Sequence, residues 1–551
     1  MTHTHSLWQD LGGFHVAGTV WADLPFHLNI ISSFVHGVNN NASVVEPLQA
    51  AFYANSTLAY PFLPDFHTAY TVGAGSSLRE ALAIPGVLLL GSFVLLLYRL
   101  SYRLTLSHLA ACASVPLTMC CGGVGAYYLW QYPEWNNFMR KDHIFHLVNA
   151  ADAFWFSLPA HILFPQRTTQ FAYPVDLVIL LCIFVTQAVP QKLKLLAVSG
   201  FVTGLLPYLQ PHSFVAVGSV ILVVAVLDVV TLAAKHGSSA SKGGLQATLS
   251  GVMSQAVKDA VWGWLVYGAV AFAVALPQMT PFFGRVAHSH GFIRWNPVSF
   301  TALVYQWARS LGLYVPLYLL SYVTFSHRRD AVKFFWGFTA VFVEANLIIF
   351  QPWELDNTKV FYIWIFGASG AVCLLLQRVA DRLKLLGKVI VGFVYLSLIL
   401  SGLLLCVQVC WGVLRALMVC ESIGGDGVVF DLVDVEYATW IRENTPADAV
   451  FLTPTGHYPR HFRESALAGR QILVGYAGWL GSHGIDYGAR QGAMSKAMRG
   501  SGDAYQHLID LGVTHITVPW KERSAFNMEF LNAVAHRVAS NGRYSVFEVP
   551  R

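Results

Sequence analysis

The chain has 551 residues, of which 55% are hydrophobic and only 12% are charged. Soluble domains carry about 25% charged residues, and a single soluble core stops growing near about 250–300 residues, so this composition excludes one large soluble domain. The net charge of +5 does not indicate nucleic-acid binding, because the basic residues lie between apolar segments and form no common face. The eight cysteines form no CxxC pair, which argues against a disulfide framework or a thiolate zinc site.

Ten apolar runs have the length of a membrane-spanning helix, for which about 20 residues are needed. They predict a polytopic α-helical membrane protein with spans at 84–100, 105–130, 174–190, 194–208, 212–233, 257–277, 299–323, 333–350, 359–379 and 388–411. No internal repeat accompanies them. The spans define a transmembrane helical domain over residues 84–411.

The segments between the spans alternate in character. Short basic segments, such as those with Arg103, Lys192 and Arg329, are typical of the cytoplasmic side. The longer segments are rich in Trp, His, Pro and acids and fall on the outer, lumenal or periplasmic, side: 1–83, 131–173, 208–212, 278–298, 351–358 and everything after about 412. Residues 1–83 then form a first outer loop with interfacial helices. Because no span precedes them, either the span at 84–100 inserts with its N-terminus outside or an N-terminal helix is missing from this sequence. We expect the missing helix.

Residues 412–551 change in composition and predict an outer, soluble α/β domain. Candidate strands lie at 449–453, 471–475, 514–518 and 544–548, and candidate helices at 435–444, 488–498, 503–511 and 525–538. This alternation indicates a small parallel sheet. No GxGxxG or GxxxxGK[ST] pattern occurs at a strand-to-helix junction, so nothing supports a nucleotide site.

Acids and histidines recur in the first outer loop. Asp23 and His27 share a helical face at i,i+4, and Asp65 is followed closely by His67. A carboxylate at a membrane surface can deprotonate an acceptor or bind a metal ion. The alternative is a solvated loop carboxylate with a neighbouring histidine.

Cationic and histidine-rich segments follow in later outer loops. Arg167 and Arg285 present guanidinium groups, which match phosphate in shape. His143 and His146 have the spacing of a metal site on one helical face, with interfacial histidines as the alternative reading. They belong to a larger group of polar residues in these loops: Asp142, Asp152, His161, His288, His290 and Arg294.

The turn at 351–359 combines two acids, an amide and a lysine at the end of an apolar span. Glu354, Asp356, Asn357 and Lys359 lie within six residues. Charges at a membrane boundary are costly unless they are paired or used, so we interpret this turn as a binding site. The alternative is an interfacial turn in which Asp356 pairs with Lys359.

Three further residues are candidates for substrate binding. His212 ends the short outer turn at 208–212. Arg470 and Trp479 lie in the glycine-rich part of the soluble domain, where an indole ring suits stacking on a sugar face. A plain loop between a strand and a helix explains the latter two equally well.

Together, Trp21-Ala-Asp23, the long first outer loop, the many spans and the C-terminal outer domain resemble the GT-C superfamily of membrane glycosyltransferases, which use polyprenyl- or dolichyl-phosphate sugars. The segment Trp440-Ile-Arg-Glu-Asn-Thr-Pro446 also looks like the start of the soluble domain in such proteins. The resemblance implies that Asp23 is the catalytic acid of the first outer loop. Here a single acid followed by His27 replaces the usual acid pair, which leaves a divalent metal open.

The resemblance implies sugar transfer from a lipid-phosphate donor to an unidentified acceptor at the outer membrane face. Asp23, with His27 and Asp65, would be catalytic, and Arg167, Arg285 and Lys359 would hold the donor phosphate. The chain would reside in the endoplasmic reticulum membrane of a eukaryote or the cytoplasmic membrane of a bacterium, among membrane lipids. The alternatives are a transporter or channel, whose charged residues usually lie on broken helices at mid-membrane, and a non-catalytic membrane scaffold.

The alternation of loops predicts which positions are reached from outside the membrane. In a cysteine-free background, a cysteine at position 242 should resist an impermeant thiol reagent added from outside. A cysteine introduced within 421–551 should react. The reverse pattern would overturn the whole topology.

Overall fold

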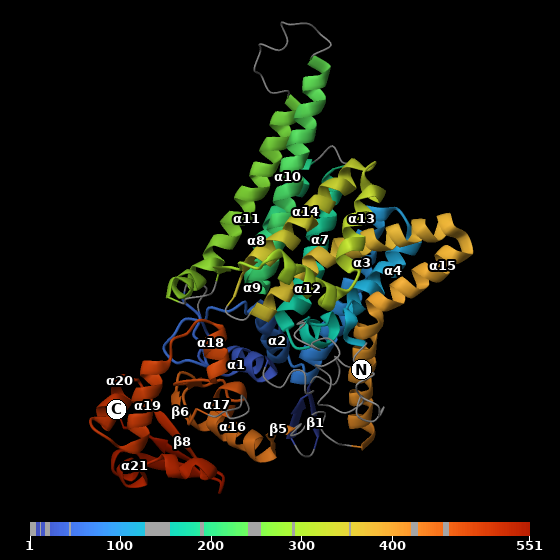
Figure 1. The fold of residues 1–551 in the computed structure, drawn as a ribbon. Helices are drawn as coiled ribbons and strands as arrows, with labels where there is room; N and C mark the ends of the chain where they lie inside the picture. Colours follow the sequence, from blue (N-terminus) through green and yellow to red (C-terminus); the bar gives the residue numbers. More distant parts are fainter. Residues whose placement is uncertain are drawn as a thin grey trace.

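The computed structural model of the chain describes residues 7–10, 13–16, 23–42, 46–126, 155–187, 192–240, 255–288, 293–351, 354–419, 428–455 and 462–550. A bundle of long helices carries an α/β unit at one end (Figure 1). We call this end the domain face. Two short helices lie between the bundle and the α/β unit there, α1 (Asp23–Val35) and α2 (Leu63–Gly73).

The bundle consists of apolar helices. They are α3 (Leu78–Thr105), α4 (His108–Cys120), α7 (Arg167–Thr186), α8 (Lys192–Gly204), α9 (Leu206–Leu209), α10 (Pro211–Ala240), α11 (Gln255–His288), α12 (Phe300–Leu311), α13 (Tyr314–Phe325), α14 (Arg329–Leu347) and α15 (Thr358–Val419). Among the described residues, six helices are long and apolar enough to cross a membrane. The predicted class of helical membrane protein is confirmed, whereas the count of ten spans stays a prediction.

Three of the predicted spans differ in detail. The prediction of a single continuous helix over 299–323 is wrong, because the helix breaks at Gly312. This glycine caps the end of α12 with a φ of +59°. The result is two helices of 12 residues each, α12 and α13. The spans expected at 359–379 and 388–411 are the two arms of α15, which meet at a kink where Lys384 has φ 53° and ψ −126°.

Three of the segments predicted to be basic lie together: the ends of α3 and α7 and the start of α14. Arg328, just before α14, donates hydrogen bonds to the carbonyls of Arg103 and Leu104 at the end of α3. Lys333 Nζ lies 2.7 Å from Gln187 Oε1 at the end of α7. The grouping agrees with the alternation seen in the sequence, and which membrane side these segments face stays a prediction.

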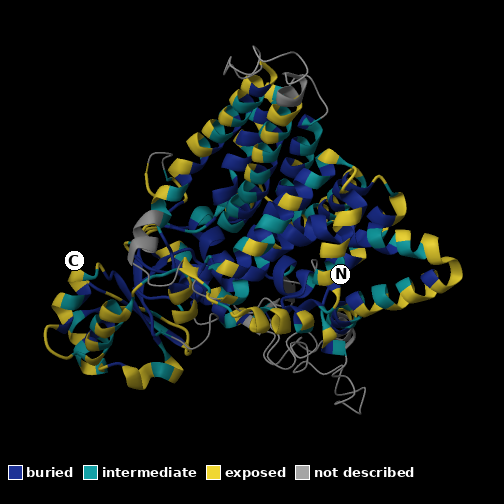
Figure 2. Cartoon of the chain, turned by 45° about the horizontal axis from the view of Figure 1, so that its top comes forward, coloured by how far each residue is buried: buried dark blue, intermediate teal, exposed yellow. Residues whose placement is uncertain are grey.

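Buried residues fill the middle of the bundle, and exposed residues lie on its outer surfaces (Figure 2). Many of the exposed residues are large and apolar. Leu222, Leu385 and Phe393 are 65%, 77% and 75% exposed. Such residues would be unfavourable in water, and they are the lipid-facing surface expected of membrane helices.

The α/β unit contains a mixed five-stranded sheet of order β7-β6-β8-β10-β9. Its strands are β6 (Val450–Leu452), β7 (Gln471–Ile472), β8 (His515–Pro519), β9 (His536–Ser540) and β10 (Tyr544–Glu548). Its helices are α16 (Leu432–Asn444), α17 (Arg463–Ala466), α18 (Ala477–Ser482), α19 (Gly488–Arg499), α20 (Ala504–Asp510), η9 (Trp520–Ala525) and α21 (Met528–Val534).

The prediction of a wholly parallel sheet is wrong. β6 pairs in parallel with β7 and β8, but β10 pairs antiparallel with both β8 and β9. The helix expected over 525–538 ends at Val534, and the following residues form β9 instead. Pairing with the open edge of β10 overrides the local helix preference of this segment, because strand formation depends on the neighbouring strand.

Short strands tie the remaining segments to this framework. The N-terminal strands β1 (Leu7–Asp10) and β2 (Gly13–Val16) form an antiparallel sheet with β5 (Val428–Asp431). The two-residue strands β3 (Arg294–Trp295) and β4 (Ile348–Ile349) pair beside the turn helix η7 (Glu354–Asn357), and η6 (Leu158–Leu163) precedes α7.

The α/β unit is fixed to α1 through a backbone contact between two glycines. A Cβ atom on Gly37 would lie 1.9 Å from the carbonyl oxygen of Gly469, and one on Gly469 would lie 2.3 Å from that of Ser32. Ser32 Oγ also donates a 2.7 Å hydrogen bond to the carbonyl of Ala466 in α17. The position of α1 is therefore coupled to that of the α/β unit.

This contact makes Gly469 intolerant of a side chain. Because its φ is +72° and its Cβ would meet backbone, Gly469→Ala should destabilise the protein by about 2 kcal/mol or more. The exposed Gly492, in α19, has open space around it, and Gly492→Ala should be neutral or stabilising by up to about 1 kcal/mol. Thermal unfolding in detergent measures both variants, and equal effects would contradict the proposed contact.

Candidate functional site

The helices α1 and α2 bring His27 and Asp65 together at the domain face. His27 Nδ1 lies 2.8 Å from Oδ2 and 3.0 Å from Oδ1 of Asp65. Because carboxylate oxygens only accept hydrogen bonds, Nδ1 carries the proton. The two side chains are 2% and 0% exposed, so this pair lies inside the protein and makes no contact with solvent.

Arg167, the first residue of α7, completes this buried group. Its Nε lies 3.4 Å from Asp65 Oδ1, and its Nη2 donates hydrogen bonds to Thr68 Oγ1 and to the carbonyl of Pro64. Arg167 therefore holds α2 against the bundle. We call His27, Asp65 and Arg167 the Asp65 clamp.

Asp23 begins α1 one helical turn before His27 and is only half-buried. Burial raises the pKa of Asp23, an effect that the charges of His27 and Lys359 oppose. The carboxylate of Asp356 raises it further. Asp23 therefore lies beside the turn at 354–359, although the two segments are more than 300 residues apart in sequence.

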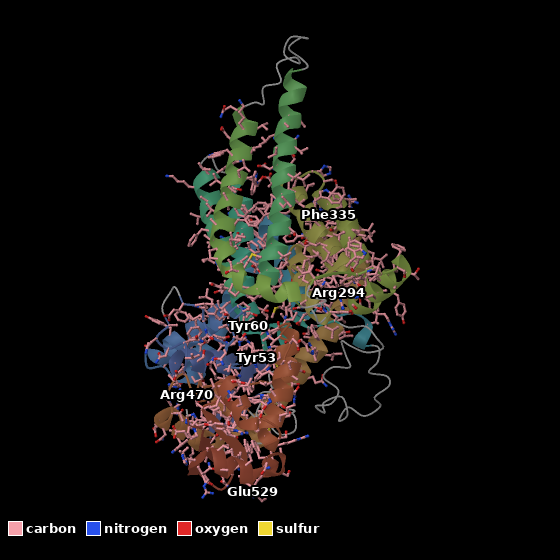
Figure 3. All side chains as sticks on the ribbon, turned by 90° about the vertical axis from the view of Figure 1, so that its left-hand side faces the viewer. Tyr53, Tyr60, Arg294, Phe335, Arg470 and Glu529 are labelled. Atoms are coloured by element: carbon pink, nitrogen blue, oxygen red, sulfur yellow. The ribbon has the colours of Figure 1, made fainter. Side chains whose placement is uncertain are left out.

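In that turn, Lys359 Nζ lies 3.0 Å from Asp356 Oδ1, and both side chains are partly exposed. His212, the second residue of α10, lies close enough to interact with both charges. The phenol of Tyr60 is half-buried and lies near the carboxylates of Asp23, Asp65 and Asp356. Burial, and then these negative charges, raise the pKa of Tyr60 well above its ordinary value. Figure 3 shows Tyr60 between the bundle and the α/β unit.

These residues form what we call the face cluster: Asp23, Tyr60, His212, Asp356 and Lys359. Three long helices begin at it, since Arg167 opens α7, Pro211 opens α10 and Thr358 opens α15. The unpaired backbone N–H groups of a helix N-terminus favour an anion. The cluster thus combines a half-buried carboxylate with a lysine and three positive helix ends.

Other predicted binding residues have structural contacts. The Asn357 side chain donates to the carbonyls of Ala345 and Ile348, at 2.9 and 2.7 Å, and accepts from the Phe350 amide, which fixes the turn before α15. Glu354 is exposed and forms an ion pair with Arg294. These contacts do not connect the side chain of Asn357 or of Glu354 to the face cluster.

The two candidates of the α/β unit are buried. Arg470 donates to the backbone carbonyls of His36, Arg442, Thr445 and Ala468, and so fastens the unit to the end of α1. The Trp479 ring, 5% exposed, packs 5.4 Å from that of Phe26. These contacts hold the unit against α1.

Several predictions concern residues outside the described ones. Asp142, His143, His146, Asp152 and His290 are not described, and the Arg285 and His288 side chains are not described either. Among the residues that are described, no group of three or more His, Cys, Asp and Glu has the arrangement of a metal site. The metal prediction over 143–146 stays a prediction.

Sequence reasoning did not single out Tyr60 or His483. The His483 ring, just after α18, stacks on Phe26 at 4.9 Å with an interplanar angle of 9°, and lies 5.2 Å from the Tyr60 ring. Through this contact with Tyr60, the α/β unit adjoins the face cluster. The Tyr60-Pro-Phe-Leu-Pro64 segment signals a turn, but nothing local indicates what its phenol contacts.

Comparisons with known proteins show what the chain resembles. A family described as Domain of unknown function (DUF6798) matches residues 434–480, and no curated protein sequence matches the chain. The crystal structure of the apo oligosaccharyltransferase of Archaeoglobus fulgidus matches with a TM-score of 0.50 and 14% identity, over 94% of this chain and 67% of that chain. The chain has a GT-C-like fold. The resemblance drawn from the sequence is confirmed at the level of the fold.

Two further solved structures are similar to the chain at slightly lower TM-scores. The oligosaccharyltransferase AglB from Archaeoglobus fulgidus, in complex with an inhibitory peptide and a dolichol-phosphate, matches with a TM-score of 0.49 and 12% identity, over 99% of this chain and 72% of that one. ArnT from Cupriavidus metallidurans in the apo state matches with a TM-score of 0.46 and 13% identity, over 98% of this chain and 94% of that one.

The Asp65 clamp makes a prediction about stability. Asp65→Asn leaves the Arg167 charge buried without its partner, which should cost about 3–5 kcal/mol. The control, Glu354→Gln, breaks an exposed ion pair with Arg294 and should cost about 1 kcal/mol or less. Thermal unfolding of the full chain in detergent compares the two. A loss in Asp65→Asn no larger than in the control would contradict the clamp.

Proposed function

We propose that the protein is a glycosyltransferase that moves a sugar from a lipid-phosphate carrier to an acceptor at the domain face of the membrane, which is the outer or lumenal face. The observation that carries the proposal is the face cluster itself. On a GT-C-like fold, it combines one half-buried carboxylate, Asp23, with a lysine and three helix N-termini. That is a base beside an anion site.

Asp23 is the proposed general base. Its carboxylate takes the proton of the acceptor while the acceptor atom forms a bond to the anomeric carbon of the sugar. The bond between that carbon and the phosphate oxygen breaks, and its electron pair stays with the lipid phosphate. The raised pKa of Asp23 makes the carboxylate a stronger base than an exposed aspartate.

Lys359 and the helix N-termini are the proposed site of the donor phosphate. The negative charge of the leaving phosphate is stabilised by the Lys359 ammonium and by the backbone N–H groups at the starts of α7, α10 and α15. His212 supplies a further polar group there. Arg285 remains a proposed phosphate ligand from the end of α11.

The roles of His27, Asp65 and Arg167 follow from their burial. All three lie within the Asp65 clamp, so we propose that they position Asp23 through α1 and do not touch the donor. The proposed donor is a polyprenyl- or dolichyl-phosphate sugar, as the archaeal structure with dolichol-phosphate suggests.

The proposal separates catalysis from donor binding in two variants. Asp23→Asn should lower transfer from a polyprenyl-phosphate hexose by about 100-fold or more and leave binding of undecaprenyl phosphate unchanged. Lys359→Met should instead weaken that binding. In the unmodified protein, kcat/KM should rise with pH through the raised pKa of Asp23, because the base must be deprotonated.

Transfer is measured with a panel of polyprenyl-phosphate hexoses, and binding by the change in tryptophan fluorescence. Near-normal transfer by well-folded Asp23→Asn would move the role of base to another acid. Absence of undecaprenyl phosphate binding in the unmodified protein would overturn the lipid-carrier proposal.

A further inference from the structure

A chain of buried polar side chains joins α7 to α10 below the face cluster. Ser213 Oγ lies 2.6 Å from Asp176 Oδ2 and 3.0 Å from Gln210 Oε1, and Gln210 Nε2 donates to Thr169 Oγ1 at 2.9 Å. All four side chains are at least 98% buried. The proposed reaction uses none of them.

Counting protons along this chain decides the state of Asp176. Ser213 has a single hydroxyl proton, yet its oxygen faces two acceptors if Asp176 is ionised. A protonated Asp176 removes the conflict, because it donates to Ser213, which then donates to Gln210 Oε1. The alternative, an ionised Asp176, requires the Gln210 amide to be reversed so that its nitrogen donates to Ser213.

The electrostatic surroundings also favour the protonated form. In the described part of the chain no cation pairs with Asp176, and its Oδ1 is buried without a hydrogen-bond partner. An ionised carboxylate in such a place is unfavourable by several kcal/mol, whereas a neutral acid is not. Only the neutral acid satisfies the Ser213 geometry with the amide as it stands.

A second buried acid of the bundle provides a contrast. Asp228, on α10, lies 2.7 Å from Lys333 Nζ and accepts a 3.2 Å hydrogen bond from Trp264 Nε1. Its charge is therefore compensated. Two buried aspartates at different depths of the same bundle thus call for opposite protonation states.

We infer that Asp176 keeps its proton and, as a hydrogen-bond donor to Ser213, positions the first turns of α7 and α10 relative to each other. These turns carry Arg167 and His212, so Asp176 is a positioning residue for the face cluster. The link to His212 rests on the proposed function, whereas the protonation state does not.

Substituting the two aspartates separates a neutral acid from a charged one. Asp176→Asn replaces one donor with another and should change the Tm by less than about 2 °C. Asp228→Asn removes the nearer and more deeply buried of the two carboxylates that face Lys333, and should lower the Tm by about 5 °C or more. Equal losses of Tm in the two variants would overturn the inference.

Infrared spectroscopy of the full chain in detergent reads the proton directly. The difference spectrum between the unmodified protein and Asp176→Asn should contain the carbonyl stretch of a protonated carboxylic acid. The difference spectrum for Asp228→Asn should lack it, and the band should shift in Ser213→Ala, where the acid loses its acceptor. If Asp176→Asn loses no such band, Asp176 is ionised and the inference fails.

The positioning role has its own readout. Ser213→Ala interrupts the chain and should weaken undecaprenyl phosphate binding about 10-fold, while Asp176→Asn should retain it. Unchanged binding in Ser213→Ala would limit Asp176 to a structural role and overturn the positioning part. If the unmodified protein does not bind this lipid, the proposed function fails, while the infrared result still tests the proton on Asp176.

Discussion

The buried carboxylate of Asp65 is the interaction on which the domain face depends. It contacts His27 of α1 and Arg167 of α7, and its own helix, α2, lies between them. An unpaired charge at such a depth would be strongly unfavourable, so the three helices have to remain together. The clamp thereby fixes the direction in which α1 leaves the bundle, and with it the position of Asp23 one turn earlier.

The α/β unit meets the same helix from the other side. The Arg470 guanidinium donates hydrogen bonds to backbone carbonyls on both sides of this contact. Gly37 and Gly469 have no side chains, so the two backbones can touch. Phe26 packs against Trp479 and His483 next to His27. The α/β unit is therefore part of the framework of the face cluster, and a change within it is expected to affect α1.

Buried carboxylates of the bundle keep their charge only where a cation lies beside them. Where a carboxylate has a cation partner, as Asp228 has Lys333, a charge is retained inside the bundle. At the face cluster, the half-buried Asp23 and Lys359 remain partly accessible beside three helix N-termini. Two partly exposed charges of opposite sign thus lie where the proposed lipid phosphate would bind.

The sequence by itself determined the membrane class, most helix positions and the GT-C resemblance, because apolar runs of about twenty residues and their basic flanks are local properties. It also singled out Asp23, Lys359 and His212. Only the tertiary structure decided which of the charged residues share a site: it buried Arg167 on Asp65 and brought Tyr60 to Asp23. The tertiary structure also decided β9, whose residues form a strand because they pair with β10, although their local sequence favours a helix. Contacts between segments hundreds of residues apart depend on packing, which no local pattern encodes.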